Sequence, residues 1–352
     1  MIPVVILVGS NSIHTIRYIK AISSYISKII FITNALDPFN LPSNVEGYVI
    51  NFRLSNIRAK FQIAKIIMPY AHAIIHIHQA NSYAYHTIKA ILLTKLSYRV
   101  ILTTWGSDIL VLPYKNLWLK RMVKFNLTHS DIVTSDSLYM SSQIKKLLPK
   151  IKQLHTINFG VQNFPPNLDF NAKEKIILSN RLHKANYNID KIIKAFAKLQ
   201  IIFPEFKLII AGTGTDTEKL QILAKTLNLK EEQIVFTGML NYEELSAWYK
   251  KAMLFISIPT SDATSLSLLE AMSYGAYPIV SNLPANLEWI MDKINGTINQ
   301  NSELLDNDLA MAINLTQQKR EDIAKINYSI IQQKAVFNNS IQYFINLYTV
   351  RN

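Results

Sequence analysis

The sequence of 352 residues contains no cysteine, which excludes disulfides, cysteine metal sites and thiol nucleophiles. This absence agrees with a reducing compartment such as the cytoplasm. No apolar run approaches the roughly 18 residues of a membrane-spanning helix, so none is expected. The apolar start MIPVVILVG follows no basic segment and stops at Gly9. It therefore predicts a first β-strand rather than a signal peptide.

Acidic residues are scarce in the first part of the chain. Residues 1–150 carry 17 Lys and Arg against 5 Asp and Glu, whereas residues 151–352 carry 20 against 19. Nearly all of the net charge of +13 therefore lies in the first part. Such one-sided charge favours a polyanionic partner, either nucleic acid or an anionic membrane surface. A merely solvated basic surface is the alternative.

The order of apolar segments predicts two α/β domains. Short Val- and Ile-rich runs alternate with amphipathic helical stretches, a pattern typical of parallel strands buried on both faces. The pattern occurs on both sides of a Pro- and Asn-rich segment, 160–175, that is typical of a hinge. We therefore expect two doubly wound, Rossmann-like parallel-sheet domains facing a cleft, with ligands at the carboxyl ends of the strands. The expected strands are 3–9, 27–34, 73–79, 99–108, 131–137, 175–181, 207–214, 233–238, 253–259 and 276–282.

The segment SDATSLSLLEAMSYG holds two carboxylates, Asp262 and Glu270, around an expected helix start. Apolar residues at helical spacing predict that the helix begins near Ser265. The backbone amides of residues 265–267 could then hold a phosphate, with the positive end of the helix dipole behind them. Glu270 could accept hydrogen bonds from a vicinal diol such as a ribose. An N-cap aspartate with a surface glutamate is the alternative.

This segment resembles the donor-binding signature of the retaining glycosyltransferases of family 4, which have the GT-B fold. Their pattern is an acid, seven further residues, and then a Glu within an LLEAM-like helix. The resemblance implies that Glu270 binds the ribose of a nucleoside-diphosphate sugar and that Asp262 contacts the transferred sugar. It also implies that the sugar and phosphates are bound by the amides of Ser265, Leu266 and Ser267. As an Asp, residue 262 reaches about 1.5 Å less far than a Glu would, so the sugar should lie deeper or be contacted through water.

Arg181, at the end of an expected strand, matches the family's arginine that binds the donor diphosphate. A guanidinium group suits two phosphate oxygens. The family's lysine usually follows where this chain has Asn186, and Lys184 is the nearest substitute. A solvated loop lysine is the alternative for Lys184.

Two glycine turns in the second half also match the family. Gly212 belongs to an incomplete dinucleotide fingerprint, which alone is a weak signal. The resemblance implies that the Gly212 loop borders the nucleobase and that the backbone of Gly238, Met239 and Leu240 lies against it. Ordinary tight turns would contain the same glycines.

In the first half, three loops match the family. Gly9 is expected to let the backbone approach the donor phosphates. The segment HIHQA resembles the family's HIHEP, which implies that His78 lies near the anomeric carbon, while His76 is expected in the core. Asp108, in a family-like GSD turn, is one of only 5 acids in the first 150 residues. It is a candidate ligand group or base on the acceptor side, with a helix N-cap as the alternative.

No metal site is expected from the sequence. Its only Asp-x-Asp triplet, 306–308, lies in a helix-like segment with no strand before it, and no other cluster has metal-ligand spacing. We therefore expect no cofactor beyond the donor substrate. The charge of the leaving diphosphate would be met by Arg181, a lysine and helix amides.

Two stretches of the basic half, 55–70 and 114–125, mix Lys and Arg with large apolar residues at helical spacing. In the second, Trp118, Met122 and Phe125 are expected to share one face. This composition is typical of a helix that rests on anionic lipid headgroups. An amphipathic helix packed inside the domain is the alternative.

The resemblance covers nearly the whole chain and implies a two-domain GT-B enzyme. Residues 1–162 with 335–352 would form an N-terminal acceptor-binding domain, onto which the last helix packs, and residues 163–334 a C-terminal donor-binding domain. The enzyme would transfer a sugar, with retention of configuration, from a nucleoside-diphosphate sugar to a hydroxyl acceptor.

For a member with a basic N-terminal domain, the resemblance implies a lipid-linked or cell-surface glycan acceptor, as in lipopolysaccharide, capsule or exopolysaccharide synthesis. The enzyme is expected to be cytoplasmic and peripheral on the inner face of the cytoplasmic membrane. No nucleic acid is expected as a partner, because no recognition motif for it is present. The alternatives are a sugar-nucleotide epimerase on the same fold and a non-catalytic GT-B binding or scaffold protein.

Overall fold

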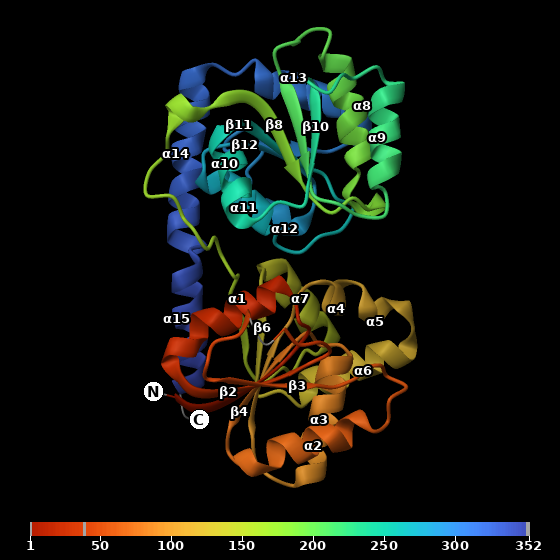
Figure 1. Ribbon diagram of the computed structural model, residues 1–352, viewed down its shortest axis with the longest axis vertical. Helices are drawn as coiled ribbons and strands as arrows, with labels where there is room; N and C mark the ends of the chain where they lie inside the picture. Colours follow the sequence, from red (N-terminus) through yellow and green to blue (C-terminus); the bar gives the residue numbers. More distant parts are fainter. Residues whose placement is uncertain (1, 38–39, 350–352) are drawn as a thin grey trace. The chain divides into compact units, whose positions relative to one another are not determined.

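The computed structural model describes residues 2–37 and 40–349. Met1, residues 38–39 and residues 350–352, which the expected N-terminal domain includes, lie outside the described residues. The chain forms two compact units: unit 1 is Met1–Phe159 with Asn338–Asn352, and unit 2 is Gly160–Phe337 (Figure 1). The sequence analysis placed the boundaries after residues 162 and 334.

Unit 1 is built on a seven-stranded parallel sheet with the order β3-β2-β1-β4-β5-β6-β7. Its strands are β1 (Ile2–Val8), β2 (Ile26–Thr33), β3 (Val45–Val49), β4 (Ile74–His78), β5 (Arg99–Thr103), β6 (Ile132–Ser135) and β7 (Leu154–Thr156). Its helices are α1 (Ile13–Ile22), α2 (Ala59–Ile67), α3 (Ser82–Thr94), α4 (Ser107–Leu110), α5 (Leu112–Lys115), α6 (Leu117–Thr128), α7 (Leu138–Leu147) and, at the end of the chain, α15 (Phe337–Thr349).

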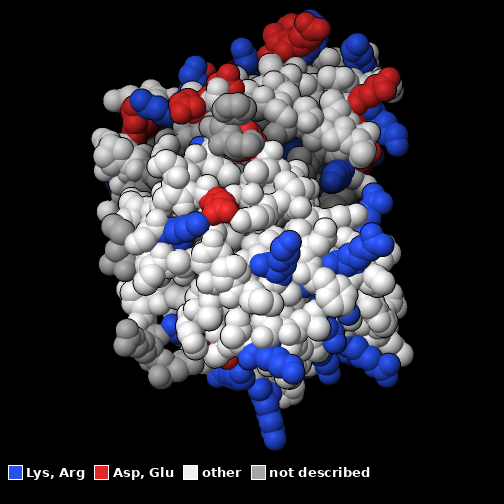
Figure 2. Space-filling model, turned by 60° about the horizontal axis from the view of Figure 1, so that its bottom comes forward, with Lys and Arg blue, Asp and Glu red and all other residues white. Residues whose placement is uncertain are grey.

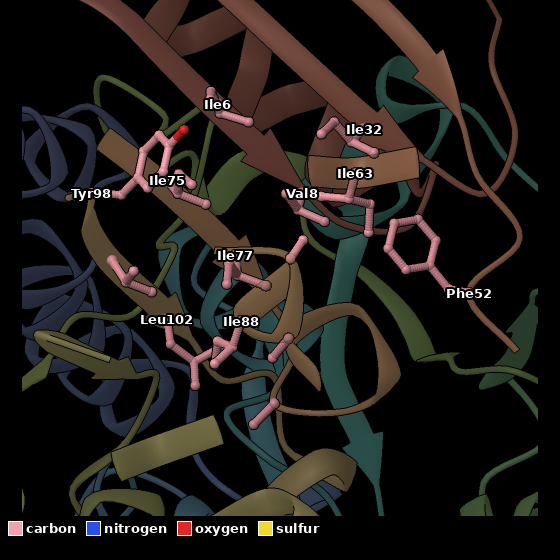
Figure 3. Packing of buried hydrophobic residues seen from close by; sticks show 14 of the residues in the cluster. Ile6, Val8, Ile32, Phe52, Ile63, Ile75, Ile77, Ile88, Tyr98 and Leu102 are labelled. Carbon is pink, nitrogen blue, oxygen red and sulfur yellow. The ribbon is translucent and has the colours of Figure 1, made fainter. Parts of the chain in front are cut away.

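The strands of unit 1 are buried on both faces because alternate apolar side chains point to opposite sides. Ile6 and Val8 pack on one face with Ile75 and Ile77 from β4 (Figure 3). Apolar residues of α2, α3, α6 and α7 complete this layer. The sheet is therefore doubly wound, with α1 and α15 packing on the opposite face.

Helix α15 is anchored in the core of unit 1. The Tyr348 hydroxyl lies 2.6 Å from His76 Nδ1 and 2.8 Å from the Tyr18 hydroxyl. The ring of Phe344, which is fully buried, stacks on Phe159 with 5.8 Å between centroids. These contacts confirm that the last helix packs on the N-terminal domain and that His76 is a core residue.

Unit 2 contains a six-stranded parallel sheet with the order β10-β9-β8-β11-β12-β13. Its strands are β8 (Glu174–Asn180), β9 (Lys207–Ala211), β10 (Ile234–Gly238), β11 (Ala252–Ser257), β12 (Tyr277–Ser281) and β13 (Thr297–Asn299). Its helices are α8 (Ile189–Leu199), α9 (Thr217–Thr226), α10 (Tyr242–Lys251), α11 (Leu266–Ser273), α12 (Pro284–Leu287), α13 (Leu305–Ile313) and α14 (Gln317–Lys334). Helices α8, α9 and α13 pack on one face, and α10, α11 and α14 on the other.

The two-domain, parallel-sheet architecture confirms the expected fold class. Three edge strands, β3, β7 and β13, were not expected, and the strand expected over 99–108 ends at Thr103. The rings of Trp118 and Phe125 both contact the ring of Tyr85 on α3, and Met122 is buried at 3% exposure, so these residues share one face of α6 as expected. That face packs on α3, and Trp118 at its edge remains 51% exposed. Within residues 2–37 and 40–349, no helix is both long and apolar enough to cross a membrane.

Candidate functional site

Each sheet has one point where the strand order reverses, and ligands of doubly wound sheets bind beyond the strand ends there. In unit 1 this point lies between β1 and β4, and in unit 2 between β8 and β11. Gly9 directly follows β1, and His78 ends β4. Arg181 directly follows β8, and Asp262 lies in the loop after β11. Residues singled out from the sequence therefore flank both switch points.

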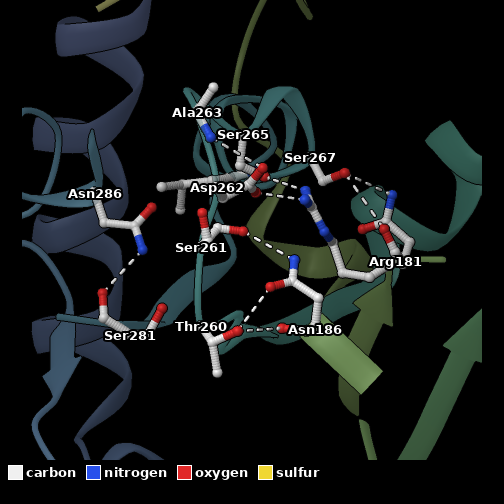
Figure 4. A network of polar contacts seen from close by, with 12 residues as sticks. Arg181, Asn186, Thr260, Ser261, Asp262, Ala263, Ser265, Ser267, Ser281 and Asn286 are labelled. Carbon is white, nitrogen blue, oxygen red and sulfur yellow. Dashed lines mark hydrogen bonds and ion pairs between the residues drawn. The ribbon is translucent and has the colours of Figure 1, made fainter. Parts of the chain in front are cut away.

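The guanidinium of Arg181 is held by three neighbours in unit 2, of which Figure 4 shows Asp262 and Ser265. Nη1 donates a hydrogen bond of 2.6 Å to Ser265 Oγ, and Nη2 forms an ion pair with Asp262 Oδ2. The group also lies over the ring of Tyr187, 4.5 Å from its centroid. The Arg181 and Asp262 side chains are only 11% and 18% exposed. Arg181 is thus a fixed, largely buried cation at the carboxyl edge of the sheet.

Asp262 has a partner that the sequence analysis did not foresee. Its Oδ2 meets Arg181, and its Oδ1 accepts a hydrogen bond of 3.1 Å from the Ala263 amide. Burial raises the pKa of this carboxyl, and the charge of Arg181 opposes the shift. The carboxylate therefore holds Arg181 in place.

The amino terminus of α11 lies beside the guanidinium. The helix begins at Leu266 with Ser265 as its N-cap, which confirms the start expected near Ser265. The Ser265 hydroxyl accepts from the Leu268 amide, and among the described residues the amides of Leu266 and Ser267 have no acceptor. The positive end of the helix dipole and these amides add to the charge of Arg181, so this place favours an anion.

Glu270 follows on the same helix and is buried at 8% exposure, unlike the surface glutamate of the alternative reading. Its Oε2 accepts a hydrogen bond of 2.9 Å from the Tyr249 hydroxyl. Asn180 Nδ2 donates to that hydroxyl at 2.8 Å and to Ser267 Oγ at 3.2 Å. Because Asn180 precedes Arg181 in the chain, the network links Glu270 to the Arg181 cluster. The sequence analysis missed Tyr249, Asn180 and the stacking ring of Tyr187, since no motif marks them.

The predicted glycine loops lie next to Arg181. The Gly212 amide donates to the Gly238 carbonyl at 2.8 Å. Gly212 has a φ of +119°, and an added Cβ would lie 2.6 Å from the Arg181 carbonyl oxygen, so a side chain is excluded there. After Gly238, Met239 is 67% exposed and Leu240 is half-buried. These residues give the edge of the site an apolar surface.

Lys184 is exposed, and within the described residues no hydrogen bond or ion pair joins its side chain to the Arg181 cluster. Asn186, at the position where the family has its lysine, forms hydrogen bonds to the loop after β11. Its Nδ2 donates to the Ser261 carbonyl at 2.9 Å, and its Oδ1 accepts from the Thr260 hydroxyl at 2.7 Å. Asn186 therefore ties the loop after β8 to the loop that carries Asp262.

In unit 1, His78 is 1% exposed and lies among aromatic rings. The centroids of Tyr18 and Trp105 lie 5.0 and 5.4 Å from that of the imidazole. Within the described residues neither ring nitrogen has a hydrogen-bond partner. Burial lowers the pKa of His78 to about 3, so the ring is neutral near pH 7. A Cβ added to Gly9 would lie 3.0 Å from His78 Cβ, which shows how closely the ends of β1 and β4 approach.

Asp108 is buried and holds two loops together. Its Oδ2 accepts from the Ala80 amide at 2.7 Å, and its Oδ1 accepts from the Trp105 amide at 3.0 Å. Burial raises the pKa of its carboxyl, and these backbone bonds oppose the rise. The N-cap of α4 is Gly106, so Asp108 is not the cap of the alternative reading. With both oxygens bonded to backbone amides, its observed role is to position the loops after β4 and β5.

The Asp-x-Asp triplet lies in α13, as its helix-like pattern predicted. Asp306 forms an ion pair of 3.0 Å with Lys198, and Asp308 accepts a hydrogen bond of 2.7 Å from Asn299. In the part of the chain that the structure describes, no three His, Asp or Glu residues are grouped so as to hold a metal ion.

Comparisons with known proteins agree with this arrangement. Residues 161–330 match the family model described as glycosyl transferases group 1, and residues 4–137 match the one described as glycosyl transferase 4-like. The alpha-monoglucosyldiacylglycerol synthase of Streptococcus pneumoniae is 30% identical over 150 residues, which are 43% of this chain and 33% of that protein. The N-acetyl-alpha-D-glucosaminyl L-malate synthase of Bacillus anthracis is 25% identical over 213 residues, 57% of this chain and 54% of that protein. The chain thus spans between a third and about half of the length of these relatives.

Among solved structures, HepE of Anabaena in complex with UDP has a TM-score of 0.79 and 14% identity, with 99% of each chain covered. At this identity the likeness shows the fold alone. The two family matches, one to each unit, together with this fold show that the chain belongs to the family-4 glycosyltransferases with the GT-B fold.

Proposed function

We propose that this glycosyltransferase moves a sugar from a nucleoside-diphosphate sugar to a hydroxyl acceptor, with retention of configuration and without a metal cofactor. The observation that carries the proposal is the Arg181 guanidinium, fixed beside the free amides of α11, with the buried Glu270 farther along the same helix. A cation and helix amides suit a diphosphate, and a buried carboxylate suits the hydroxyls of a ribose.

The donor would be bound as follows. Arg181 and the amides of Leu266 and Ser267 hold the diphosphate and stabilise the charge that develops as it leaves. Glu270 accepts hydrogen bonds from the ribose hydroxyls, and the Gly238 turn with Met239 borders the base. Asp262 keeps Arg181 oriented and contacts the sugar directly or through water.

Unit 1, taken by itself, carries groups that suit contact with a sugar. His78 is neutral, and neither ring nitrogen has a hydrogen-bond partner among residues 2–37 and 40–349, so it can both donate to and accept from sugar hydroxyls. Asp108 holds the loop after β4, which follows His78, and the loop after β5, which contains Trp105. Gly9, which has no side chain, leaves the backbone after β1 open to close approach by a ligand.

For the acceptor, we propose a lipid-linked or cell-surface glycan reached from an anionic membrane surface, at the inner face of the cytoplasmic membrane. The sequence has no acid between Glu46 and Asp108. Lys and Arg gather on the face of unit 1 seen in Figure 2, with few acids among them. Exposed apolar side chains accompany these cations: Phe61 on α2 is 56% exposed, and Leu117 and Trp118 on α6 are 74% and 51% exposed. Cations beside exposed large apolar groups suit lipid headgroups.

The enzyme proposal is tested with a panel of nucleotide sugars. We expect one nucleoside-diphosphate sugar to raise the melting temperature, because a ligand that binds only the folded state stabilises it. With that donor and lipid-linked glycan acceptors, transfer should continue in EDTA, and NMR should show the donor's anomeric configuration in the product. Conversion of the donor without any acceptor would instead indicate an epimerase. Binding without turnover of any acceptor in the panel would indicate a scaffold protein.

The membrane proposal is tested by flotation with phosphatidylcholine vesicles, with and without phosphatidylglycerol. Binding should require the anionic lipid and weaken at high salt, because screening shortens the reach of surface charges. Trp118→Ala should weaken binding. Ile201→Ala, which removes an 88% exposed side chain from unit 2, should not. Binding that is independent of salt or of anionic lipid would refute the proposal.

A further inference from the structure

Tyr249 on α10 is a fully buried tyrosine whose hydroxyl lies in the polar network beneath the Arg181 cluster. Its ring stacks on Tyr274, with 5.9 Å between centroids and an interplanar angle of 16°. The ring is thereby fixed, so the position of the hydroxyl oxygen is fixed as well. Its hydrogen bond to Glu270 Oε2 measures 2.9 Å.

The direction of each hydrogen bond in this network follows from its chemistry. An ionised carboxylate only accepts, so the Tyr249 hydroxyl donates its proton to Glu270. The hydroxyl oxygen can then accept, and Asn180 Nδ2 donates to it at 2.8 Å. Burial and the nearby charge of Glu270 raise the pKa of Tyr249, so the hydroxyl keeps its proton at physiological pH. The hydrogen bonds therefore run in one direction, from Asn180 as donor to Tyr249 and from Tyr249 as donor to Glu270.

We propose that Tyr249 is a positioning residue that fixes the rotation of the Glu270 carboxylate for the two hydroxyls of the donor ribose. The inference rests on the proposed function, because it requires that Glu270 bind the ribose. A carboxylate accepts two neighbouring hydroxyls well only when its plane faces them, and a hydrogen bond to one oxygen from a rigid donor sets that plane. Tyr249 itself does not touch the nucleotide; it acts through Glu270.

A second buried tyrosine of unit 2 provides a matched control. Tyr277 on β12 is 4% exposed, and its hydroxyl lies 2.8 Å from Thr297 Oγ1. A Phe in its place removes one buried hydrogen bond from the same unit without touching the Glu270 network. Any loss of nucleotide binding caused by a general weakening of unit 2 should therefore appear in both variants.

The test measures nucleoside diphosphate binding by calorimetry for the wild type, Tyr249→Phe, Tyr277→Phe, Glu270→Ala and the double variant Tyr249→Phe/Glu270→Ala. The probes are UDP, GDP, ADP and, for whichever binds best, its 2′,3′-dideoxy analogue. We expect Tyr249→Phe to weaken binding of the ribonucleotide about tenfold, because one hydrogen bond to a charged group is lost. Tyr277→Phe should bind like the wild type.

The dideoxy analogue and the double variant separate a positioning role from a structural one. The dideoxy analogue should bind Tyr249→Phe and the wild type equally, and Tyr249→Phe should cost nothing further once Glu270 is absent. The positioning role is refuted if Tyr249→Phe weakens binding of the dideoxy analogue as much as binding of the ribonucleotide. It is also refuted if Tyr249→Phe causes the same loss of affinity in the Glu270→Ala background as in the wild type. In both cases the donor site stands. If the wild type binds none of the nucleotides, the proposed function fails and the inference fails with it.

Discussion

At the scale of single residues, the ion pair of Arg181 and Asp262 decides how the donor side of the site is held. Both side chains are largely buried, at 11% and 18% exposure, so removal of one partner leaves the other charge without compensation. We expect Arg181→Ala to lower the free energy of unfolding by about 2 kcal/mol, measured by urea denaturation.

The matched control for Arg181→Ala is an exposed ion pair in the same unit. Lys194 and Asp190 on α8 are 55% and 44% exposed, so Lys194→Ala should cost less than about 0.5 kcal/mol. Equal losses in the two variants would show that the Arg181 pair is no better shielded from water than a surface pair.

His78 gives a prediction for pH dependence. Its pKa is about 3 in the folded protein against about 6.5 in an unfolded chain, so the unfolded state binds more protons between these values. The free energy of unfolding is therefore highest above pH 6.5. It falls as the pH drops below this value, by about 1.4 kcal/mol at pH 5.5, because the unfolded chain takes up a proton that the folded protein does not. His78→Phe should therefore lose about 1.4 kcal/mol less stability than the wild type between pH 7.5 and 5.5, measured by denaturant unfolding.

If His78→Phe loses as much stability as the wild type between the two pH values, the ring of His78 is not held neutral by burial.

At the scale of elements, the sequence predicts the central strands and the edge strand β10 but misses the three edge strands β3, β7 and β13. The central strands are continuous Val and Ile runs buried on both faces, which the sequence displays directly. The edge strand β3 reads VEGYV and is half-exposed, and β7 has only three residues, so neither gives an apolar run. Strand β13 also has only three residues, although all of them are buried. Edge strands depend on pairing with a formed sheet, which local sequence does not encode.

Sequence reasoning reached part of the candidate site. The amino terminus of α11 and the strand-end positions of Arg181 and His78 follow from local pattern. The partners of these residues do not, because Tyr249, Asn180 and Tyr187 come from other elements and meet the site only in the folded unit. The same holds for Asp108, whose two bonds to backbone amides a GSD motif cannot reveal.

The N-cap of α11 gives a prediction at this scale. Ser265→Ala should cost about 1 kcal/mol of stability, as is usual for a lost serine cap, and should also weaken nucleoside diphosphate binding because Arg181 loses a hydrogen bond. Thr316 caps α14 in the same unit, and Thr316→Ala should cost a similar amount without changing nucleotide affinity. Calorimetry and thermal unfolding distinguish the two. If Ser265→Ala and Thr316→Ala bind the nucleotide with equal affinity, Ser265 is not part of the site.

At the scale of the whole molecule, unit 1 is assembled from two separate segments of chain, whereas unit 2 is continuous. Without α15, the core of unit 1 loses Phe344 and Tyr348, and His76 Nδ1 loses the shorter of its two hydrogen bonds, keeping only the one of 3.3 Å with the Tyr18 hydroxyl. We expect a protein that ends at Phe337 to unfold unit 1 at a markedly lower temperature while unit 2 still binds a nucleoside diphosphate. Scanning calorimetry with and without nucleotide separates the two transitions. Loss of both transitions together would show that the units do not fold independently.

The central claim is that unit 2 carries a nucleotide-sugar site made by Arg181, the start of α11 and Glu270. The most direct test is titration calorimetry of the wild type, Arg181→Ala and Glu270→Ala with nucleoside diphosphates. We expect one nucleoside diphosphate to bind the wild type and each variant to bind it at least about tenfold more weakly, since each loses a charged hydrogen-bonding group. Undiminished binding to both variants, or no binding of any nucleoside diphosphate to the wild type, would contradict the claim.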